Sequence, residues 1–350
     1  MLDLGNVPAA DDFPPADQPI ELAETTHPLA MDLCADCGLA QLADDDTVTS
    51  EPRGVEPRAL RDQARDAVAR VAASGWLRGE TVREFGSPHG GSWLELLAQS
   101  DVEPRSGSAD IVLDCFGIMH EPDQRAAFAQ RAAATAPGGV LLLQYHSLAT
   151  IVGQGQWNAL RHGHFAYYSL PAVTRLLADA GMRPVTAWEF GLYGGTALLA
   201  AVHDDDERTA EPVIAQLSAS EVEMLDPVTV GVLQAAADWH ALALRTYLEQ
   251  QLIAGRRVFG YGAASRAVAL FARAGLDHRL LTAVADASPA KQGRRMPGTD
   301  IAIISPDALV AAGPDEVVLT LSDLLPEVSE RLPELAGRWV TDDWIATQTG

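Results

Sequence analysis

Apolar positions recur at two different spacings along this chain, and together they predict alternating helices and strands. A helical spacing is clearest in residues 57–76, where apolar side chains lie three or four positions apart at Leu60, Ala64, Val68 and Val71. Apolar runs of strand length follow at residues 81–86, 109–117 and 140–146. A helical stretch at about 122–135 separates the last two runs. Strand–helix–strand alternation of this kind favours a parallel sheet with crossover helices.

The same pattern returns in the second half of the chain. A helix near 170–180 and strands near 183–190 and 196–203 would complete the first sheet, and the charged, turn-rich stretch 203–212 marks a boundary. A long helix at about 227–254 then leads into further strands and helices. Residues 1–50 are rich in Pro, Asp and Ala and have weak periodicity, which predicts a small irregular module. We therefore predict three domains, with the limits 1–56, 57–203 and 204–350.

Composition and charge narrow the function classes. Hydrophobic residues make up 47% of the chain and charged residues 21%, so a large core can form. The 48 acidic side chains outnumber the 25 basic ones, and the formal net charge is −23. This charge argues against binding to nucleic acid or to an anionic membrane, since both are polyanions. No apolar run reaches 18 residues and the N-terminus is acidic, so we expect a cytoplasmic protein without a membrane span.

A glycine turn follows the first predicted strand. Gly86 and Gly90 allow the backbone to approach a ligand closely, and Glu84 precedes them in the form E-x-G-x-x-x-G, which is typical of the loop that holds S-adenosylmethionine in class I methyltransferases. Glu103 lies about twenty residues beyond the turn, the spacing expected of a carboxylate that binds ribose. The alternatives are an ordinary strand–helix turn and a surface acid.

The segment 161–169 concentrates side chains that can move or bind protons. It contains His162, His164, Tyr167 and Tyr168 within nine residues. A histidine can act as a general base near neutral pH, and a tyrosine can donate a hydrogen bond to an oxyanion or enolate. Core packing of the aromatic residues is the main alternative, and a metal site is another.

A second glycine turn, in residues 260–267, predicts an anion site in the last domain. The N-terminus of the following helix together with Arg266 could hold a phosphate. Tyr261 lies in the turn, and Lys291, the single lysine of the chain, follows the next predicted strand. We take these three residues as candidates for binding the diphosphate of a nucleotide sugar, against the alternative of a helix cap and an exposed loop.

Six motifs in order resemble one family, the C-methyltransferases that act on nucleotide-linked keto-deoxysugars. They are DLCADCGLAQL, EFGSPHGG, ADIVLDCFGIMHEPD with PGGVLLLQYH, HGHFAYYSL, EFGLYGGTALL, and FGYGAASRA followed by VADASPAKQGRRMPGTDIAIISPDAL. The resemblance covers nearly the whole chain. It implies an α/β fold with a Rossmann-like class I methyltransferase domain, a second Rossmann-like C-terminal domain that binds the nucleotide sugar, and a small N-terminal zinc module.

The reaction implied by the resemblance is methyl transfer from S-adenosylmethionine to the carbon beside a sugar ketone. His164 matches the family's base, which removes a proton from that carbon and so forms an enolate, with His162, Tyr167 and Tyr168 lining the same pocket. Glu84, Gly86, Gly90 and Glu103 would hold the methyl donor. The resemblance also connects the chain with deoxysugar and antibiotic biosynthesis.

The chain departs from the family pattern at several points. Arg161 and Gly163 stand where the family has tyrosine and glutamate. The family's zinc module uses four cysteines, whereas this chain offers only Cys34 and Cys37 there, so a site would need a further ligand such as His27. Between Glu103-Pro104 and Ala109 the chain is too short for the helix and strand of a standard domain, which predicts a trimmed sheet.

These departures leave three functions open. The first is the C-methyltransferase itself. The second is an enzyme that keeps the nucleotide-sugar site and enolises, epimerises or rearranges a keto-sugar without the methyl donor. The third is a non-catalytic homologue that binds a nucleotide sugar or a partner enzyme. The sequence predicts no oligomeric state.

Overall fold

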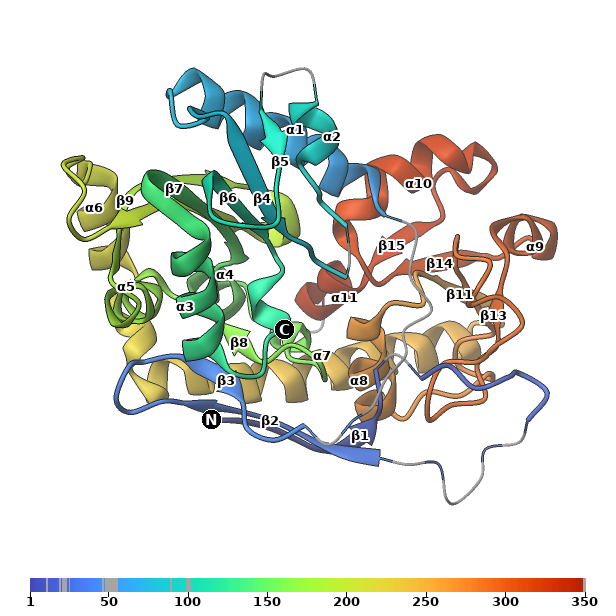
Figure 1. Ribbon diagram of the computed structural model, residues 1–350. Helices are drawn as coiled ribbons and strands as arrows, with labels where there is room; N and C mark the ends of the chain where they lie inside the picture. Colours follow the sequence, from blue (N-terminus) through green and yellow to red (C-terminus); the bar gives the residue numbers. More distant parts are fainter. Residues whose placement is uncertain are drawn as a thin grey trace.

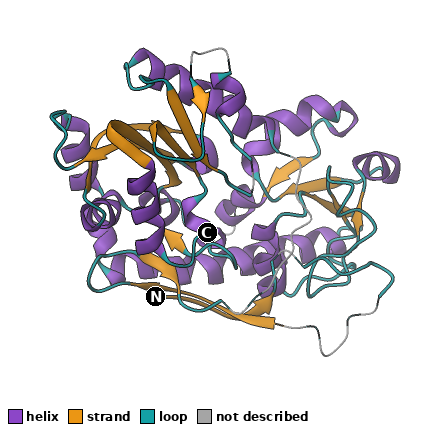
Figure 2. Cartoon of the chain, in the orientation of Figure 1, coloured by secondary structure: helices purple, strands orange, loops and turns teal. Residues whose placement is uncertain are grey.

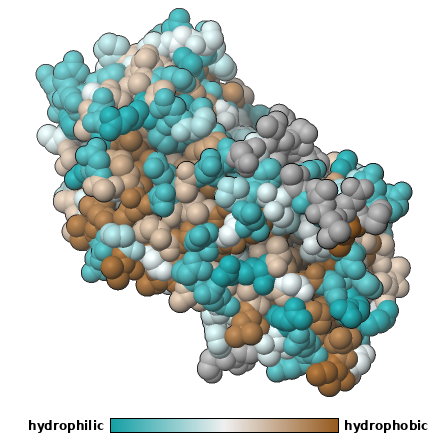
Figure 3. Space-filling model, turned by 90° about the horizontal axis from the view of Figure 1, so that it is seen from below, coloured by the Kyte–Doolittle hydropathy of each residue, from teal (hydrophilic) through white to brown (hydrophobic). Residues whose placement is uncertain are grey.

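The computed structural model describes residues 1–10, 12–18, 20, 24, 26–45, 47, 56–88, 90–98 and 102–348. Within them the strands form three sheets, and helices surround the strands (Figure 1, Figure 2). Hydrophilic and hydrophobic side chains are interspersed on the face seen from below (Figure 3). Among these residues, no helix is both long and apolar enough to cross a membrane.

The N-terminal residues form an antiparallel sheet. Its order is β1-β2-β3-β8, with the bounds β1 (Leu2–Pro8), β2 (Thr26–Leu33), β3 (Ala40–Leu42) and β8 (Ala166–Tyr167). The prediction of an irregular module was wrong for these strands. They alternate buried and exposed side chains only over short stretches, and β8 comes from a distant part of the chain, so local periodicity was a weak signal.

The largest of the three sheets has six strands. Its order is β5-β4-β6-β7-β10-β9, with the bounds β4 (Thr81–Phe85), β5 (Glu103–Pro104), β6 (Ala109–Cys115), β7 (Thr135–His146), β9 (Met182–Phe190) and β10 (Thr196–His203). Strands β5, β4, β6 and β7 are parallel, and β10 is antiparallel to both of its neighbours. The prediction of a parallel sheet is confirmed for these four strands, and β10 makes the whole sheet mixed.

Helices cover this sheet and contribute to its apolar core. They are α1 (Arg58–Ala73), α2 (Leu94–Leu97), α3 (Gln124–Ala134), α5 (Leu170–Asp179) and α6 (Pro212–Ser220). Helix α4 (Leu148–Gly153) packs instead against α7 (Pro227–Ile253). The buried side of α1 includes Leu60, Ala64 and Val71, three of the positions from which the helix was predicted. Because one face of α1 is apolar and the other charged, it packs along a single stripe.

The trimmed edge of the sheet is also confirmed. Strand β5 has two residues, and the next four residues lead directly into β6 without another helix or strand. The sheet therefore ends at β5. This edge strand pairs only with the first residues of β4, Thr81 and Val82.

The C-terminal sheet has five parallel strands in the order β13-β12-β11-β14-β15. Its bounds are β11 (Val258–Tyr261), β12 (Val284–Ala285), β13 (Ile303–Ile304), β14 (Glu316–Leu319) and β15 (Trp339–Thr341). The helices are α7 (Pro227–Ile253), α8 (Ser265–Ala274), α9 (Pro306–Ala312), α10 (Leu325–Arg331) and α11 (Asp342–Gln348). The molecule is thus an α/β protein with a methyltransferase-like sheet and a second Rossmann-like sheet.

Contacts cross the predicted domain limits. Helix α6 lies beyond the predicted boundary at 203 but packs against β9 of the six-stranded sheet. Strand β1 packs against α7 and α8, which belong to the C-terminal part of the chain. The predicted limits of the three domains therefore remain predictions.

Candidate active site

A cavity of about 240 Å³ is lined by residues at the carboxyl ends of parallel strands from two sheets. Ser87, Phe116 and His146 follow or end β4, β6 and β7 on one side. On the other side, Tyr261 ends β11, and Asp286 follows β12. Open α/β sheets bind ligands at the carboxyl ends of their strands. This cavity is therefore the candidate active site.

The first glycine turn borders this cavity. Gly90 lines it with φ of +94°, and a side chain on Gly86 would meet no atom within 4 Å. Glu84 braces the turn, because its carboxylate accepts hydrogen bonds from Ser92 Oγ at 2.6 Å and from the Trp93 N–H at 2.7 Å. His89, which belongs to the same turn, lies outside the described residues.

A carboxylate that sequence reasoning did not single out lies against the turn. Glu56 lines the cavity, and its Oε1 accepts a hydrogen bond from the Gly91 N–H at 2.6 Å. A Cβ on Gly90 would lie 2.6 Å from the same oxygen, so only glycine leaves room for this contact. Nothing in the local sequence pattern distinguishes Glu56 from other surface acids.

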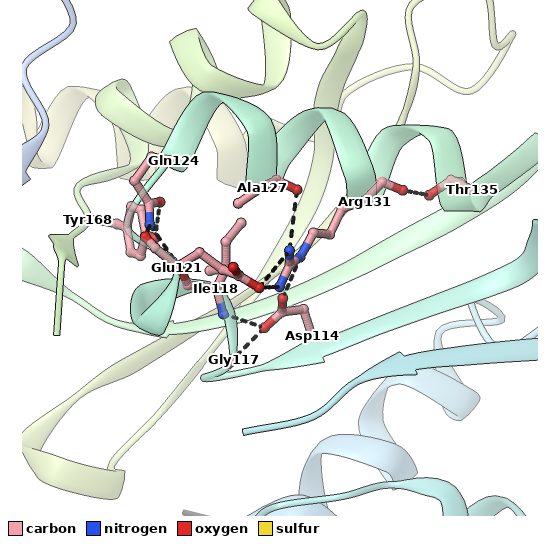
Figure 4. A network of polar contacts seen from close by, with 9 residues as sticks. All are labelled: Asp114, Gly117, Ile118, Glu121, Gln124, Ala127, Arg131, Thr135 and Tyr168. Carbon is pink, nitrogen blue, oxygen red and sulfur yellow. Dashed lines mark hydrogen bonds and ion pairs between the residues drawn. The ribbon is translucent and has the colours of Figure 1, made fainter. Parts of the chain in front are cut away.

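The end of β6 is held by a buried ion pair (Figure 4). Arg131 Nε in α3 donates to Asp114 Oδ2 at 2.8 Å, and the two side chains are 2% and 0% exposed. Asp114 Oδ1 also accepts from the N–H groups of Gly117 at 2.8 Å and Ile118 at 2.9 Å. These bonds fix the turn after β6, in which Phe116 adopts φ of 63° on the cavity wall.

His164 lines the cavity and is contacted by an arginine three residues before it. Arg161 Nε and Nη2 lie 2.8 Å and 2.5 Å from His164 Nε2. A guanidinium has only donors, so His164 Nε2 acts as the acceptor and the ring proton is on Nδ1. The ring of His120 approaches that of His164 edge-on, with 4.5 Å between centroids.

The structure divides the other residues of the segment 161–169. Tyr167 lines the cavity, where its hydroxyl donates to the Ala159 carbonyl oxygen at 3.2 Å and accepts from the Arg161 N–H at 3.2 Å. His162 does not line the cavity, and its Nε2 donates to the Pro28 carbonyl oxygen of the N-terminal sheet at 3.1 Å. Tyr168 packs in the core and donates to Gln124 Oε1 at 2.5 Å (Figure 4).

The C-terminal wall carries all three residues predicted for diphosphate binding, Tyr261, Arg266 and Lys291. Lys291 Nζ donates to the Ala263 carbonyl oxygen at 2.8 Å and lies 4.8 Å from the centre of the Phe13 ring, so it stabilises the second glycine turn. Within the described residues, the guanidinium of Arg266 makes no hydrogen bond or ion pair. Burial and the nearby charge of Arg161 lower the pKa of Arg266.

Glu103 lies beside the start of β4, whereas the first glycine turn follows the end of that strand. It pairs with Thr81, and the strand ends at Phe85. Four residues of a strand span about 13 Å. The side chain is exposed and does not line the cavity, so the register does not bring it to the turn.

Cys34 and Cys37 alone do not form a complete metal site. Cys34 and Cys37 are free thiols in the turn between β2 and β3. Backbone hydrogen bonds from Cys37 and Asp36 lower the pKa of Cys34, while burial raises that of Cys37. No group of three or more His, Cys, Asp or Glu side chains within the described ranges is placed to hold a metal. These residues do not fit a zinc ion.

Two further cavity residues carry no obvious signal in the sequence. His146, the last residue of β7, is 6% exposed, and burial and the charge of Arg266 lower its pKa to about 3. It is therefore a neutral imidazole at physiological pH. Tyr193 lies in the turn before β10 with φ of 56°. The neighbouring leucine and two glycines indicate a turn, but they do not predict that the Tyr193 side chain faces the cavity.

Comparison with known proteins matches two adjoining parts of the chain to family models. Residues 57–187 match the family model of a methyltransferase domain, and residues 191–342 match that of a C-methyltransferase C-terminal domain. The chain is thus similar to methyltransferases in one part and to C-methyltransferases in the next. The candidate cavity is lined by residues from both matched regions.

Two kinds of relative are similar to the chain. C-methyltransferase NovU of Streptomyces niveus is 25% identical over 245 residues, which are 69% of this chain and 58% of that protein. Magnesium protoporphyrin IX methyltransferase of Synechocystis PCC 6803, solved with bound SAH, has a TM-score of 0.32 and 16% identity over 42% of this chain and 85% of that chain. At such a TM-score, the fold assignment rests on the strand order and on the family models.

Proposed function

We propose that this protein transfers a methyl group from S-adenosylmethionine to the carbon beside the ketone of a nucleotide-linked keto-deoxysugar. The observation that supports this most is that one cavity is bordered by a glycine turn, by His164 and by Arg266, whose guanidinium makes no hydrogen bond or ion pair among the described residues. The reaction needs a place for the methyl donor, a base and an anion site. Gly90, His164 and Arg266 supply these three at the same cavity.

The residues at the glycine turn fit a small methyl donor. The space beside Gly86 is open, and Ser87 and Gly90 line the cavity there. Glu84 keeps the turn in shape, and Glu56 offers a carboxylate at its other side. When bound, S-adenosylmethionine supplies an electrophilic methyl group to the carbon that has lost its proton.

His164 is the base in this proposal. Its Nε2 lone pair takes the proton from the carbon beside the ketone, and the electron pair of the C–H bond moves into an enolate. In the structure this lone pair accepts from Arg161, so the arginine must turn away when the substrate binds. An anionic substrate in the same cavity offers the Arg161 guanidinium another partner.

Replacing Gly86 by alanine tests the methyl-donor end of the cavity. The added Cβ meets no protein atom within 4 Å and Gly86 has no positive φ, so we expect unchanged stability. The methyl would instead occupy space that the donor needs, and calorimetry should show weaker S-adenosylmethionine binding. Gly153→Ala, equally free of contacts but remote from the cavity wall, is the matched control. Equal binding by both variants would contradict this placement.

Replacing Arg266 by methionine tests the anion site. Hydrogen bonds to a charged group contribute about 1.5–3 kcal/mol, so affinity for a nucleoside diphosphate should fall about 10- to 100-fold. The melting temperature should not fall, because burial disfavours the charged guanidinium and, among the described residues, it makes no hydrogen bond or ion pair. Arg279→Met, at an exposed arginine outside the cavity, serves as the control. If Arg266→Met bound the nucleotide as tightly as the wild-type protein, Arg266 would not be part of a diphosphate site.

One structural feature favours a second candidate, an enzyme that enolises a keto-sugar without a methyl donor. The sheet ends at the two-residue strand β5, and Glu103 does not reach the glycine turn. Calorimetry with millimolar S-adenosylmethionine separates the two candidates. Heat of binding supports methyl transfer, whereas no heat, combined with deuterium exchange into a keto-sugar, leaves the donor-independent reaction.

A further inference from the structure

Two residues other than glycine have positive φ in the described part of the chain, and both line the cavity. They are Phe116, with φ of 63°, and Tyr193, with φ of 56°. Their rings meet edge to face, with 6.1 Å between centroids. A bulky side chain rarely adopts this conformation, and strain of this kind gathers at functional sites. The strain therefore indicates a functional role for these two residues in the cavity.

Side chains from two other segments hold Tyr193 in this conformation. Its N–H donates to Asp323 Oδ2 at 2.9 Å, and Asp323 belongs to the C-terminal part of the chain. Its carbonyl oxygen accepts from Gln156 Nε2 at 3.1 Å. The Arg266 guanidinium lies over its ring, 5.4 Å from the centre. These contacts fix both the backbone and the ring of Tyr193, and so restrict the position of its hydroxyl.

The hydroxyl of Tyr193 differs from those of the tyrosines in segment 161–169. Those of Tyr167 and Tyr168 donate to acceptors within the protein. No hydrogen bond joins the Tyr193 hydroxyl to another residue in the described part of the chain. Burial raises the pKa of Tyr193, so the phenol keeps its proton at neutral pH and remains a donor.

The geometry points to Tyr193 as the residue that donates a hydrogen bond to the substrate's ketone oxygen and stabilises the enolate formed there. This inference rests on the proposed function, in which His164 on the same cavity removes the neighbouring proton. As that C–H bond breaks, the proton goes to His164 and negative charge gathers on the ketone oxygen. A donor that is fixed before the reaction stabilises that charge without reorganisation. The positive charge of Arg266 lies over the ring of this donor.

Tyr193→Phe tests this inference, because it removes the hydroxyl and keeps the ring and the backbone. The measurement is deuterium uptake from D₂O at the carbon beside the ketone of a nucleoside-diphosphate-linked keto-deoxysugar, followed by NMR. Loss of one such donor lowers kcat about 10²- to 10³-fold. We expect that loss with KM and nucleotide affinity little changed. Tyr145→Phe, which removes a buried hydroxyl in the sheet core, should exchange at the wild-type rate.

Two results would overturn the inference in distinguishable ways. Wild-type exchange by Tyr193→Phe, in a preparation where the wild-type protein is active, would exclude Tyr193 as the donor and leave the proposed function intact. Absence of exchange by the wild-type protein itself, with S-adenosylmethionine present, would overturn the proposed function and the inference with it. Circular dichroism melting of each variant shows whether a loss of rate is a loss of fold.

Discussion

Replacing His164 by glutamine is expected to lower the rate of proton exchange at the carbon beside the ketone by about 10²- to 10⁴-fold, the usual contribution of a general base. Glutamine can still accept a hydrogen bond from Arg161 through its amide oxygen, but it cannot take a proton at neutral pH. The variant therefore keeps the hydrogen bond from Arg161 and removes the group that accepts the proton. NMR detection of deuterium uptake measures the effect.

The control for this experiment is a histidine outside the cavity. His278 is exposed and hydrogen-bonded to Asp300, so His278→Gln should exchange at the wild-type rate. Nucleotide binding by His164→Gln should also persist, because Arg266 belongs to α8 in the C-terminal part of the chain. If His164→Gln exchanged as fast as His278→Gln, another group would have to be the base.

Replacing Arg131 by methionine is expected to lower the free energy of unfolding by about 3–5 kcal/mol. The change leaves the carboxylate of Asp114 buried without its cation, and at least two N–H groups of the turn after β6 depend on that carboxylate. Urea unfolding followed by circular dichroism measures the loss. The cavity wall at Phe116 follows this turn, so exchange should fall as well.

An exposed ion pair provides the comparison. Arg65 and Asp62 form one in α1, with exposed fractions of 60% and 57%, and such pairs contribute about 0–1 kcal/mol. Arg65→Met should therefore change stability little. The paired change Arg131→Met with Asp114→Asn should recover much of the loss, because no buried charge remains and the amide oxygen still accepts from the Gly117 and Ile118 N–H groups. Equal stability of Arg131→Met and Arg65→Met would contradict the role of the buried pair.

Local pattern was enough to predict most of the fold. The spacing of Leu60, Ala64 and Val71 predicts α1, and the helix predicted at about 227–254 agrees with α7 to within a residue at each end. The missing segment after β5 was visible because chain length limits what can fold between two strands. These predictions succeed because helices and buried strands have their own repeat, whatever they pack against.

The N-terminal sheet and the sorting of the candidate residues depend on contacts distant in the sequence. Strand β8 pairs with β3 across more than a hundred residues, and this pairing places Tyr167 on the cavity wall. Successive side chains of an extended segment point to opposite sides, so Tyr168 enters the core instead. Glu103 was chosen by its spacing from the glycine turn, which does not specify the register of β5 against β4.

Tyr193 and Arg161 could not be assigned from the sequence for a different reason. The φ of Tyr193 is set by Asp323 and Gln156, which are far from it in the chain. Arg161 stands next to the predicted histidines, but only the folded turn shows that its guanidinium meets His164 Nε2. Both contacts arise in a cavity that residues from two sheets form together. A local sequence pattern predicts helices and strands, but not contacts between distant segments.

The most direct test of the whole account is methyl transfer itself. The protein is incubated with S-adenosylmethionine carrying a ¹³C-labelled methyl group and with a panel of nucleoside-diphosphate-linked keto-deoxysugars, and the products are analysed by NMR. The account predicts a labelled methyl bonded to the carbon beside the ketone, formed by the wild-type protein and not by His164→Gln. A labelled methyl on oxygen, or no labelled product while the sugar still exchanges its proton, would contradict it.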